Sequence, residues 1–174
     1  YMDMSKVIVL DTETTGLTSD DEILQLSIID GNGKTLLNRL FKPAHHDSWE
    51  RAMTVNRITP EMVQSQGTLK ESSDEINQIL KDCKTIVGYN VAFDLRMLFN
   101  NGISIPVKTI HDVMEKFAHV MGVRKPNGKF KFFKLTECAQ FYGFNPKEMN
   151  FHDSLTDVIA TLHCYKAIGA DNFN

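Results

Sequence analysis

The chain is most strongly constrained by an apolar run near its start that ends in two acids. Residues 7–10 read Val-Ile-Val-Leu, and Asp-Thr-Glu-Thr-Thr-Gly follows at residues 11–16. A short run rich in β-branched residues predicts a strand that is buried on both faces. Side chains two residues apart on a strand point to the same side, so Asp11 and Glu13 are expected to converge where this strand leaves the core.

Two converging carboxylates repel each other unless a cation lies between them. Oxygen ligands suit Mg²⁺ or Mn²⁺, and Mg²⁺ is usually held by few carboxylates, with water and substrate phosphate completing its shell. Residues 11–16 therefore predict half of a metal site that handles phosphate. The same residues also fit a plain polar exit from a strand, in which Thr14, Thr15 and Gly16 form the turn.

Length and composition favour one globular domain. The chain has 174 residues, of which 42% are hydrophobic and 24% charged, so we expect a single domain over residues 1–174. Residues 1–5 show no periodicity and are expected to be a frayed terminus or an appended remnant. No apolar run reaches the ~18 residues of a membrane span and no signal-peptide core is present, which favours a cytoplasmic protein without membrane contact.

Net charge and cysteine content say little about the partners of this chain. The formal net charge of −3 gives no global attraction to nucleic acid, so such a partner would need a local basic patch or metal ions. Cys83, Cys138 and Cys164 are far apart and lie in partly apolar surroundings. We expect all three to be reduced core residues.

The order of the predicted elements indicates the fold class. Strands are expected at 23–30 and 34–41, joined by a Gly-Asn-Gly turn, and at 85–89; residues 103–110 are expected to lead to another strand or an extended segment. Helices are expected at 73–83, 91–101, 112–121, 135–142 and 153–168, with a short helix capped by Ser48 within the ambiguous range 48–58 and a helix entry at Thr59-Pro60. Strands first and then strands alternating with helices predict an α/β fold, with a mixed sheet and helices on both faces.

Two later segments carry further candidates for the acidic site. Asp94 lies in the first turn of the helix that follows the strand at 85–89, where the helix dipole favours negative charge. His152 precedes the last helix and Asp157 lies five residues later, so both can approach one pocket. Taken singly, Asp94 fits an ordinary helix start and His152 fits an ordinary surface residue.

Taken together, the three segments resemble a known family. Asp11-Thr-Glu13, Asn90-x-x-Phe93-Asp94 and His152-x-x-x-x-Asp157 are similar, in order and spacing, to the three motifs of the DEDDh, or DnaQ-like, exonucleases. This group includes the proofreading epsilon subunit of bacterial DNA polymerase III. The resemblance implies a ribonuclease H-like fold with a five-stranded mixed sheet whose first three strands are antiparallel.

The resemblance also implies an activity and residue roles. It predicts 3′–5′ exonuclease activity that releases nucleoside monophosphates by two-metal-ion hydrolysis, with two Mg²⁺ or Mn²⁺ ions. Asp11 would contact both ions, Glu13 and Asp157 the first, and Asp94 the second. His152 would be the general base, because an imidazole with a pKa near ~6.5 can accept a proton near neutral pH.

The expected substrate is the 3′ end of nucleic acid, with single-stranded DNA favoured over RNA. By resemblance, residues Thr14, Thr15, Gly16 and Leu17 line the pocket for the terminal nucleotide, and Asn90 belongs to the same site. Leu17 fits a core position after a turn equally well. A DNA polymerase is among the partners that the resemblance implies. Tyr89 stands where many members have His, and residues 56–59, Asn-Arg-Ile-Thr, stand where many have His-Gly-Ile-Thr, which places substrate preference in doubt.

Residues 124–134 form the densest basic segment. They combine five cations with three phenylalanines, a mixture that suits phosphate attraction and base stacking. Lys129, Lys131 and Lys134 are therefore predicted to steer the strand. A solvated loop anchored by buried phenylalanines is the alternative.

Three other functions compete with DNA hydrolysis. The first is RNA trimming by the same fold. The second is an aspartyl phosphatase of the haloacid-dehalogenase type, which would require an acid-base Asp where this chain has Glu13 and leaves His152 without a role. The third is a module that binds 3′ ends without cutting them.

Overall fold

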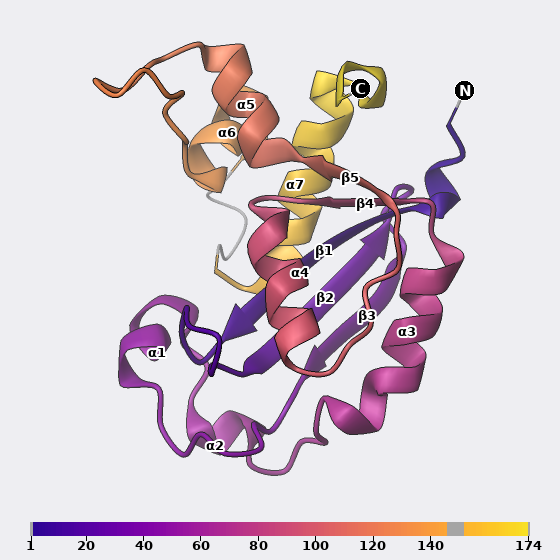
Figure 1. The fold of residues 1–174 in the computed structure, drawn as a ribbon, viewed down its shortest axis with the longest axis vertical. Helices are drawn as coiled ribbons and strands as arrows, with labels where there is room; N and C mark the ends of the chain where they lie inside the picture. Colours follow the sequence, from indigo (N-terminus) through magenta and orange to yellow (C-terminus); the bar gives the residue numbers. More distant parts are fainter. Residues whose placement is uncertain (1, 146–151, 174) are drawn as a thin grey trace.

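The computed structural model describes residues 2–145 and 152–173 and has a five-stranded mixed sheet at its centre (Figure 1). The strand order is β3-β2-β1-β4-β5. The pairs β1–β2 and β2–β3 are antiparallel, as predicted for the first three strands, and the pairs β1–β4 and β4–β5 are parallel. The strands are β1 (Val7–Thr14), β2 (Ile23–Asp30), β3 (Thr35–Leu40), β4 (Thr85–Gly88) and β5 (Thr109–Asp112).

Helices cover both faces of the sheet, which confirms the predicted fold class. On one face, α3 (Ser73–Asp82) and α4 (Val91–Asn100) pack on alternate residues of β1 and β2 (Figure 1). The other face is covered by α5 (Val113–Met121), α6 (Leu135–Phe141) and α7 (Ser154–Ile168). The two faces have separate apolar clusters because successive strand residues point to opposite sides.

The last helix, α7, is buried on more than one side. It packs against β1, β2 and α6, so Ala160 and Cys164 are as fully buried as Val158 and Tyr165. The helical spacing of apolar residues in the sequence predicts one buried stripe on this helix, formed by Leu155, Val158, Ile159, Leu162 and Tyr165. In the structure Ile159 is exposed, so that stripe is incomplete. Cys83, Cys138 and Cys164 are all buried, as predicted.

Two short helices close the lower end of the sheet in Figure 1. They are α1 (Glu50–Asn56) and α2 (Pro60–Val63), and Trp49 packs between them with its indole Nε1 donating to the Ile58 carbonyl at 2.6 Å. The predicted helix entry at Thr59 is confirmed, because its hydroxyl accepts from the Met62 N–H. The predicted Ser48 cap is wrong: the helix begins after Trp49, which makes no side-chain capping bond.

The start of the described chain is ordered. The Asp3 carboxylate caps a 3₁₀ helix at Met4–Lys6, and the Met4 carbonyl accepts the Gly31 N–H at 2.9 Å, next to the β2–β3 turn. The expectation of a frayed segment is therefore wrong from Asp3 onward. Short 3₁₀ turns also occur at Lys70–Ser72 and Ala170–Phe173. Among the described residues, none of the helices has the length and apolar character to span a bilayer.

Candidate active site

The two acids of the first motif lie at the end of β1, beyond its pairing with β4. The β1–β4 ladder ends at Val9 and Val87, whereas β1 continues to Thr14. Asp11 and Glu13 lie opposite Ser27 and Gln25 of β2, so both point to the face that carries α7. The prediction that these acids share one side of the strand is confirmed.

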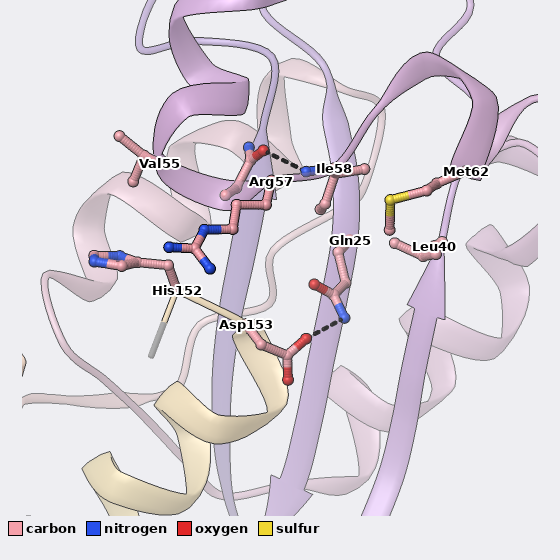
Figure 2. Close-up of a pocket in the computed structure, with 9 residues that line it drawn as sticks. Gln25, Leu40, Val55, Arg57, Ile58, Met62, His152 and Asp153 are labelled. Carbon is pink, nitrogen blue, oxygen red and sulfur yellow. Dashed lines mark hydrogen bonds between the residues drawn. The ribbon is translucent and has the colours of Figure 1, made fainter. Parts of the chain in front are cut away.

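Polar contacts from β2 fix the start of α7 above these acids. The hydroxyl groups of Ser27 and Ser154 lie 2.6 Å apart and are fully buried. The Gln25 Nε2 donates to the Asp153 carboxylate at 3.1 Å, and Asp153 in turn caps α7 by accepting the Thr156 N–H (Figure 2). Gln25, Ser27 and Asp153 were not singled out from the sequence, because their contacts join segments more than 120 residues apart.

Docking α7 in this way brings Asp157 to the β1 acids. Asp11, Glu13 and Asp157 each offer a carboxylate oxygen, and these three oxygens lie within 4.8 Å of one another. The structure thus assembles three of the four predicted metal ligands into one half-buried group. Their proximity depends on β1 and α7, which come from opposite ends of the chain.

The fourth acid, Asp94, reaches the site from the other face of the sheet. Its side chain is 2% exposed, and its Oδ1 accepts the Thr12 hydroxyl at 2.6 Å and the Thr12 N–H at 3.1 Å. Thr12 lies between Asp11 and Glu13, so Asp94 is adjacent to the group of three although it is not a member of it. Thr12 is a site residue that the sequence analysis missed.

The electrostatics of these acids differ from those of ordinary surface carboxylates. Burial raises the pKa of Asp11 well above its usual value, and the charges of Asp94, Asp157 and Glu13 raise it further. Burial and the neighbouring charges raise the pKa of Glu13 to about 9. Burial also raises the pKa of Asp157 and of Asp94 to about 7, although Thr12 partly opposes the shift at Asp94. Without a cation, this site therefore retains protons at neutral pH.

The donor set fits a hard divalent cation. The Asp11 Oδ2 is buried, and the described residues provide it with no hydrogen-bond donor. A buried carboxylate oxygen without a donor is costly unless a cation neutralises it. Because Asp11, Glu13 and Asp157 offer only oxygen atoms, Mg²⁺ or Mn²⁺ suits them better than a metal that prefers nitrogen or sulfur.

His152 lies at the entrance to this site. Its backbone N–H donates to the Asp157 carboxylate at 3.4 Å, and its backbone has a left-handed φ of 74°. Its side chain is exposed and lines a cavity of about 260 Å³ between β2, β3, α1 and the start of α7 (Figure 2). The imidazole is thus free to meet a substrate that enters beside Asp157.

Arg57 lines the same cavity and has an unusual backbone conformation. Its guanidinium lies near His152 in Figure 2, and its φ is 59°, in the left-handed region that costs a non-glycine residue roughly 1–2 kcal/mol. The preceding Asn56 donates to the Thr14 carbonyl at 3.0 Å, which ties this turn to the end of β1. The sequence marked residues 56–59 as unusual but gave no indication that they border His152.

The predicted substrate segment forms a tight turn beside the acids. The Thr14 hydroxyl donates to the Gly16 carbonyl at 2.6 Å, and the Thr15 hydroxyl donates to Asp21 at 2.8 Å. A Cβ at Gly16 would lie 2.5 Å from an Asp21 oxygen, so a larger residue would push the Asp21 carboxylate away from Thr15 and Thr18. Leu17 is 80% exposed, which makes the alternative of a core leucine wrong.

The remaining predicted residues lie outside the acidic group. Asn90 begins α4 with a left-handed φ of 63°, and its N–H donates to Asp112 at 2.8 Å. The three predicted lysines lie between α5 and α6, in a segment that Figure 1 places above the sheet and away from α1 and α2. These lysines are Lys129, Lys131 and Lys134. In the described structure they contact only residues close to them in the sequence and none of the four acids.

The basic segment is anchored in the core at only one of its ends. Phe133 packs on Phe117 in the core, whereas Phe132 is 55% exposed. The Lys131 ammonium lies 4.9 Å from the Phe133 ring, and the Arg124 guanidinium lies 4.2 Å from the Phe130 ring. Part of the segment is anchored and part is open to solvent, so its role in steering a strand stays a prediction.

Sequence comparison assigns the chain to a family. The sequence model of the RNase T exonuclease family matches residues 8–165, which include all four acids and His152. The chain belongs to this exonuclease family. The DnaQ-like resemblance inferred from the three motifs is thereby confirmed, and family membership gives no support to an aspartyl phosphatase.

Individual relatives agree with the family. The chain is 29% identical to an uncharacterised exonuclease, CP81, of Escherichia phage 186, over 92% of this chain and 87% of that protein. It is 26% identical to RNA exonuclease 4 of Candida glabrata, over 97% of this chain and 62% of that protein. These relatives are exonucleases by name, and one of them is named for RNA.

Solved structures share the fold. An exonuclease I structure from E. coli with single-stranded DNA has a TM-score of 0.76 at 20% identity, over 97% of this chain and 41% of that chain. Exonuclease X in complex with 5′-overhanging duplex DNA has a TM-score of 0.68 at 18% identity, over 97% and 94% of the two chains. The chain thus spans about two fifths of exonuclease I and nearly all of exonuclease X.

Proposed function

We propose that this domain is a 3′–5′ exonuclease that hydrolyses the terminal phosphodiester of a nucleic-acid strand and releases nucleoside monophosphates. The observation that carries the proposal is the convergence of Asp11, Glu13 and Asp157 within 4.8 Å, with Asp94 held beside them by Thr12. Four acids from three separate segments have no evident structural reason to meet in one half-buried place. Their raised pKa values indicate that the site is built for a positive charge.

The four acids would hold two divalent cations between them. Asp11, Glu13 and Asp157 would hold one divalent cation, and Asp94, with Asp11, would help to hold a second. When bound, such cations supply the positive charge that stabilises a phosphodiester during attack by water. The protein's own part is to fix the carboxylates, which Thr12 does for Asp94 and which Gln25 and Ser27 do indirectly for Asp157.

His152 is proposed as the general base. Its side chain is exposed beside Asp157, while its backbone N–H contacts the Asp157 carboxylate. A neutral imidazole in this position can accept the proton of the attacking water on its unprotonated ring nitrogen. Such proton transfer typically accelerates a reaction by ~10² to 10⁴-fold.

The 3′-terminal nucleotide would occupy the cavity of Figure 2 and the adjoining turn at residues 14–17. Leu17 is an exposed apolar side chain at the edge of this turn, well placed to contact a base. A volume of about 260 Å³ accommodates a small group rather than a folded strand. This size favours action at a chain end.

DNA is the proposed substrate, and RNA is the second candidate. Exonuclease X and exonuclease I, which share the fold, were solved with DNA, and their complexes support the first choice. RNA exonuclease 4, at 26% identity, supports the second. A direct comparison of DNA and RNA digestion decides between the two substrates.

A single assay tests polarity and substrate together. Matched single-stranded DNA, duplex DNA and RNA, each labelled at the 5′ end, are incubated with the protein and Mg²⁺. The proposal predicts a ladder that shortens from the 3′ end, and no digestion of a strand blocked by a 3′-phosphate or closed into a circle. Equal digestion of the circular strand would refute 3′–5′ polarity, and faster digestion of RNA would reverse the substrate order.

A further inference from the structure

A second cluster of potential ligands lies outside the proposed active site. Glu22 immediately precedes β2, and His45 and His46 lie in the segment that follows β3. One ligand atom from each of these residues lies within 4.8 Å of the other two. The His45 Nδ1 is 3.3 Å from the Glu22 Oε1, and the His46 Nδ1 is 2.7 Å from the Glu22 Oε2.

The far nitrogen of each ring also faces an oxygen. The His45 Nε2 lies 3.3 Å from the Asp20 carbonyl, and the His46 Nε2 lies 3.3 Å from the Asp21 carboxylate. If each Nε2 carries the proton and donates it to that oxygen, each Nδ1 presents a lone pair toward the Glu22 carboxylate. Lone pairs and a carboxylate around one point repel unless a cation lies among them.

This arrangement matches the way proteins orient metal-binding histidines. A ligating imidazole usually donates its other N–H to a carboxylate or a backbone carbonyl, which fixes the ring and its tautomer. Asp21 and the Asp20 carbonyl supply these two acceptors here. The Glu22 side chain is itself held in place, because it accepts the N–H groups of Ala44, His45 and His46 at 2.6, 3.1 and 3.0 Å.

We propose that Glu22, His45 and His46 form a binding site for a transition-metal ion of the Zn²⁺ class. Two imidazole nitrogens and one carboxylate oxygen suit Zn²⁺, Co²⁺ or Ni²⁺, whereas the oxygen-only group at Asp11 suits Mg²⁺ or Mn²⁺. Three protein ligands leave a fourth position for water. His46 also lines a surface hollow of about 450 Å³, and His45 is exposed, so an ion has a path to the site.

The ion would join two segments that border the active site. Asp21 accepts the Thr15 hydroxyl at 2.8 Å and the Thr18 N–H at 2.8 Å, so it connects His46 to the turn that carries Leu17. Binding at His45 and His46 would hold the segment after β3 against residues 15–22. The expected consequence is a higher Tm and a more rigid wall on this side of the substrate turn.

Calorimetric titration with Zn²⁺ tests the site at Glu22, His45 and His46. The acidic group around Asp11 is weakened in every sample, so that Zn²⁺ binding there does not mask the result. All proteins carry Asp11→Asn, and the double variant His45→Ala/His46→Ala is compared with the control His119→Ala, which removes an exposed histidine on α5. The double variant should lose one Zn²⁺ per chain and the control should keep it. Asp21→Asn should weaken binding by roughly 10-fold, since it removes only the acceptor that orients His46.

A measurement on the unmodified chain guards against misfolding of the variants. Histidine side-chain NMR spectra are recorded while Zn²⁺ is added, and the Nδ1 resonances of His45 and His46 should shift together. The proposal is overturned if Zn²⁺ binds equally to the double variant, or if His152 shifts while His45 and His46 do not. Binding of Zn²⁺ at His45 and His46 would support it whether or not the domain cleaves DNA.

Discussion

Two groups of acids at the same end of the sheet have opposite surroundings. Asp11, Glu13 and Asp157 bring carboxylate oxygens within 4.8 Å of one another in a half-buried place, and burial raises the pKa of each. At Asp21 and Glu22 burial acts in the same direction, but hydrogen bonds reverse it and lower both pKa values. Without a metal ion, those hydrogen bonds come from Thr18 and Thr15 to Asp21, and to Glu22 from the backbone of residues 44–46 and from the His46 Nδ1 in the tautomer that carries its proton there.

The comparison shows that residue type alone does not define a site. In the metal-free protein, N–H and O–H donors stabilise the charges of Asp21 and Glu22, so these two carboxylates stay charged whether or not a metal ion binds His45 and His46. At Asp11 the described structure provides no donor to the buried Oδ2, so the carboxylates need either protons or metal ions. Asp94 is intermediate, because burial raises its pKa to about 7 while Thr12 stabilises its charge.

The largest effect is expected from removing a charge at the centre of the first group. Asp11→Asn keeps the shape of the side chain but loses the ligand that the other acids surround. A loss of several kcal/mol of transition-state stabilisation corresponds to roughly 10³-fold or more in kcat/KM. Glu22→Gln is the matched control in the second group and should retain activity within about tenfold. Equal losses in the two variants would contradict the distinction between the groups.

Removal of His152 should have the next largest effect. His152→Ala is expected to lower kcat by ~10² to 10⁴-fold and to leave Mn²⁺ affinity unchanged, because the acids alone hold the cations. The acidic limb of the pH–rate profile should disappear with the imidazole. If calorimetry instead shows weaker Mn²⁺ binding, then His152 is a ligand and its proposed role as a base is wrong.

The contact between Thr12 and Asp94 provides a more subtle test. Thr12→Val removes the hydroxyl that donates at 2.6 Å but preserves the backbone N–H bond and the volume of the side chain. A hydrogen bond to a charged group is worth about 1.5–3 kcal/mol, so we expect kcat to fall by roughly 10 to 100-fold. Thr12→Ser, which keeps the hydroxyl, should retain most of the activity. Similar losses in both would assign Thr12 to packing.

The two groups of acids should change the free energy of unfolding in opposite directions as the pH rises. Without metal, the folded pKa values of about 7 for Asp157 and about 9 for Glu13 lie above the usual values near ~4 of an unfolded chain. The folded state then holds more protons, so the free energy of unfolding falls as pH rises from about 4 toward these values. Asp21 and Glu22 act oppositely, since their contribution is present above the unfolded pKa and is lost in acid.

Thermal unfolding in EDTA between pH 5 and 9 checks this sign. The Tm should decrease with rising pH, by about 2–4 °C for each kcal/mol lost, and added Mg²⁺ should flatten the decrease. Glu13→Gln should flatten it as well. A Tm that rises with pH across this window in EDTA would show that the acids are not protonated in the folded protein.

Most of the fold could be predicted from local patterns, and the site only in part. The apolar run before Asp11 and the Gly-Asn-Gly turn after β2 are local signals, and both gave the right elements. Asp11, Glu13, Asp94 and Asp157 were predicted as site residues because the order and spacing of the three motifs resemble those of the exonuclease family. The structure confirms that Asp11, Glu13 and Asp157 meet.

Contacts between distant segments could not be predicted in the same way. The bonds from Thr12 to Asp94 and from Gln25 to Asp153 join residues 82 and 128 positions apart, and nothing in their neighbourhoods indicates a partner. Ile159 was assigned to a buried stripe because periodicity assumes one apolar face, whereas α7 packs between β-strands and α6. The left-handed φ of Arg57 likewise follows from the turn after α1 and not from its residue type.

Proton release on Mn²⁺ binding tests the central claim most directly. Calorimetric titrations at pH 7 in buffers of different ionisation enthalpy count the protons that leave when the metal binds. If Asp11, Glu13 and Asp157 hold protons that a cation replaces, binding should release about one proton or more, and Asp11→Asn should abolish the high-affinity phase. Mn²⁺ binding without proton release, or with the same affinity in Asp11→Asn, would contradict the assignment of these acids as the metal site.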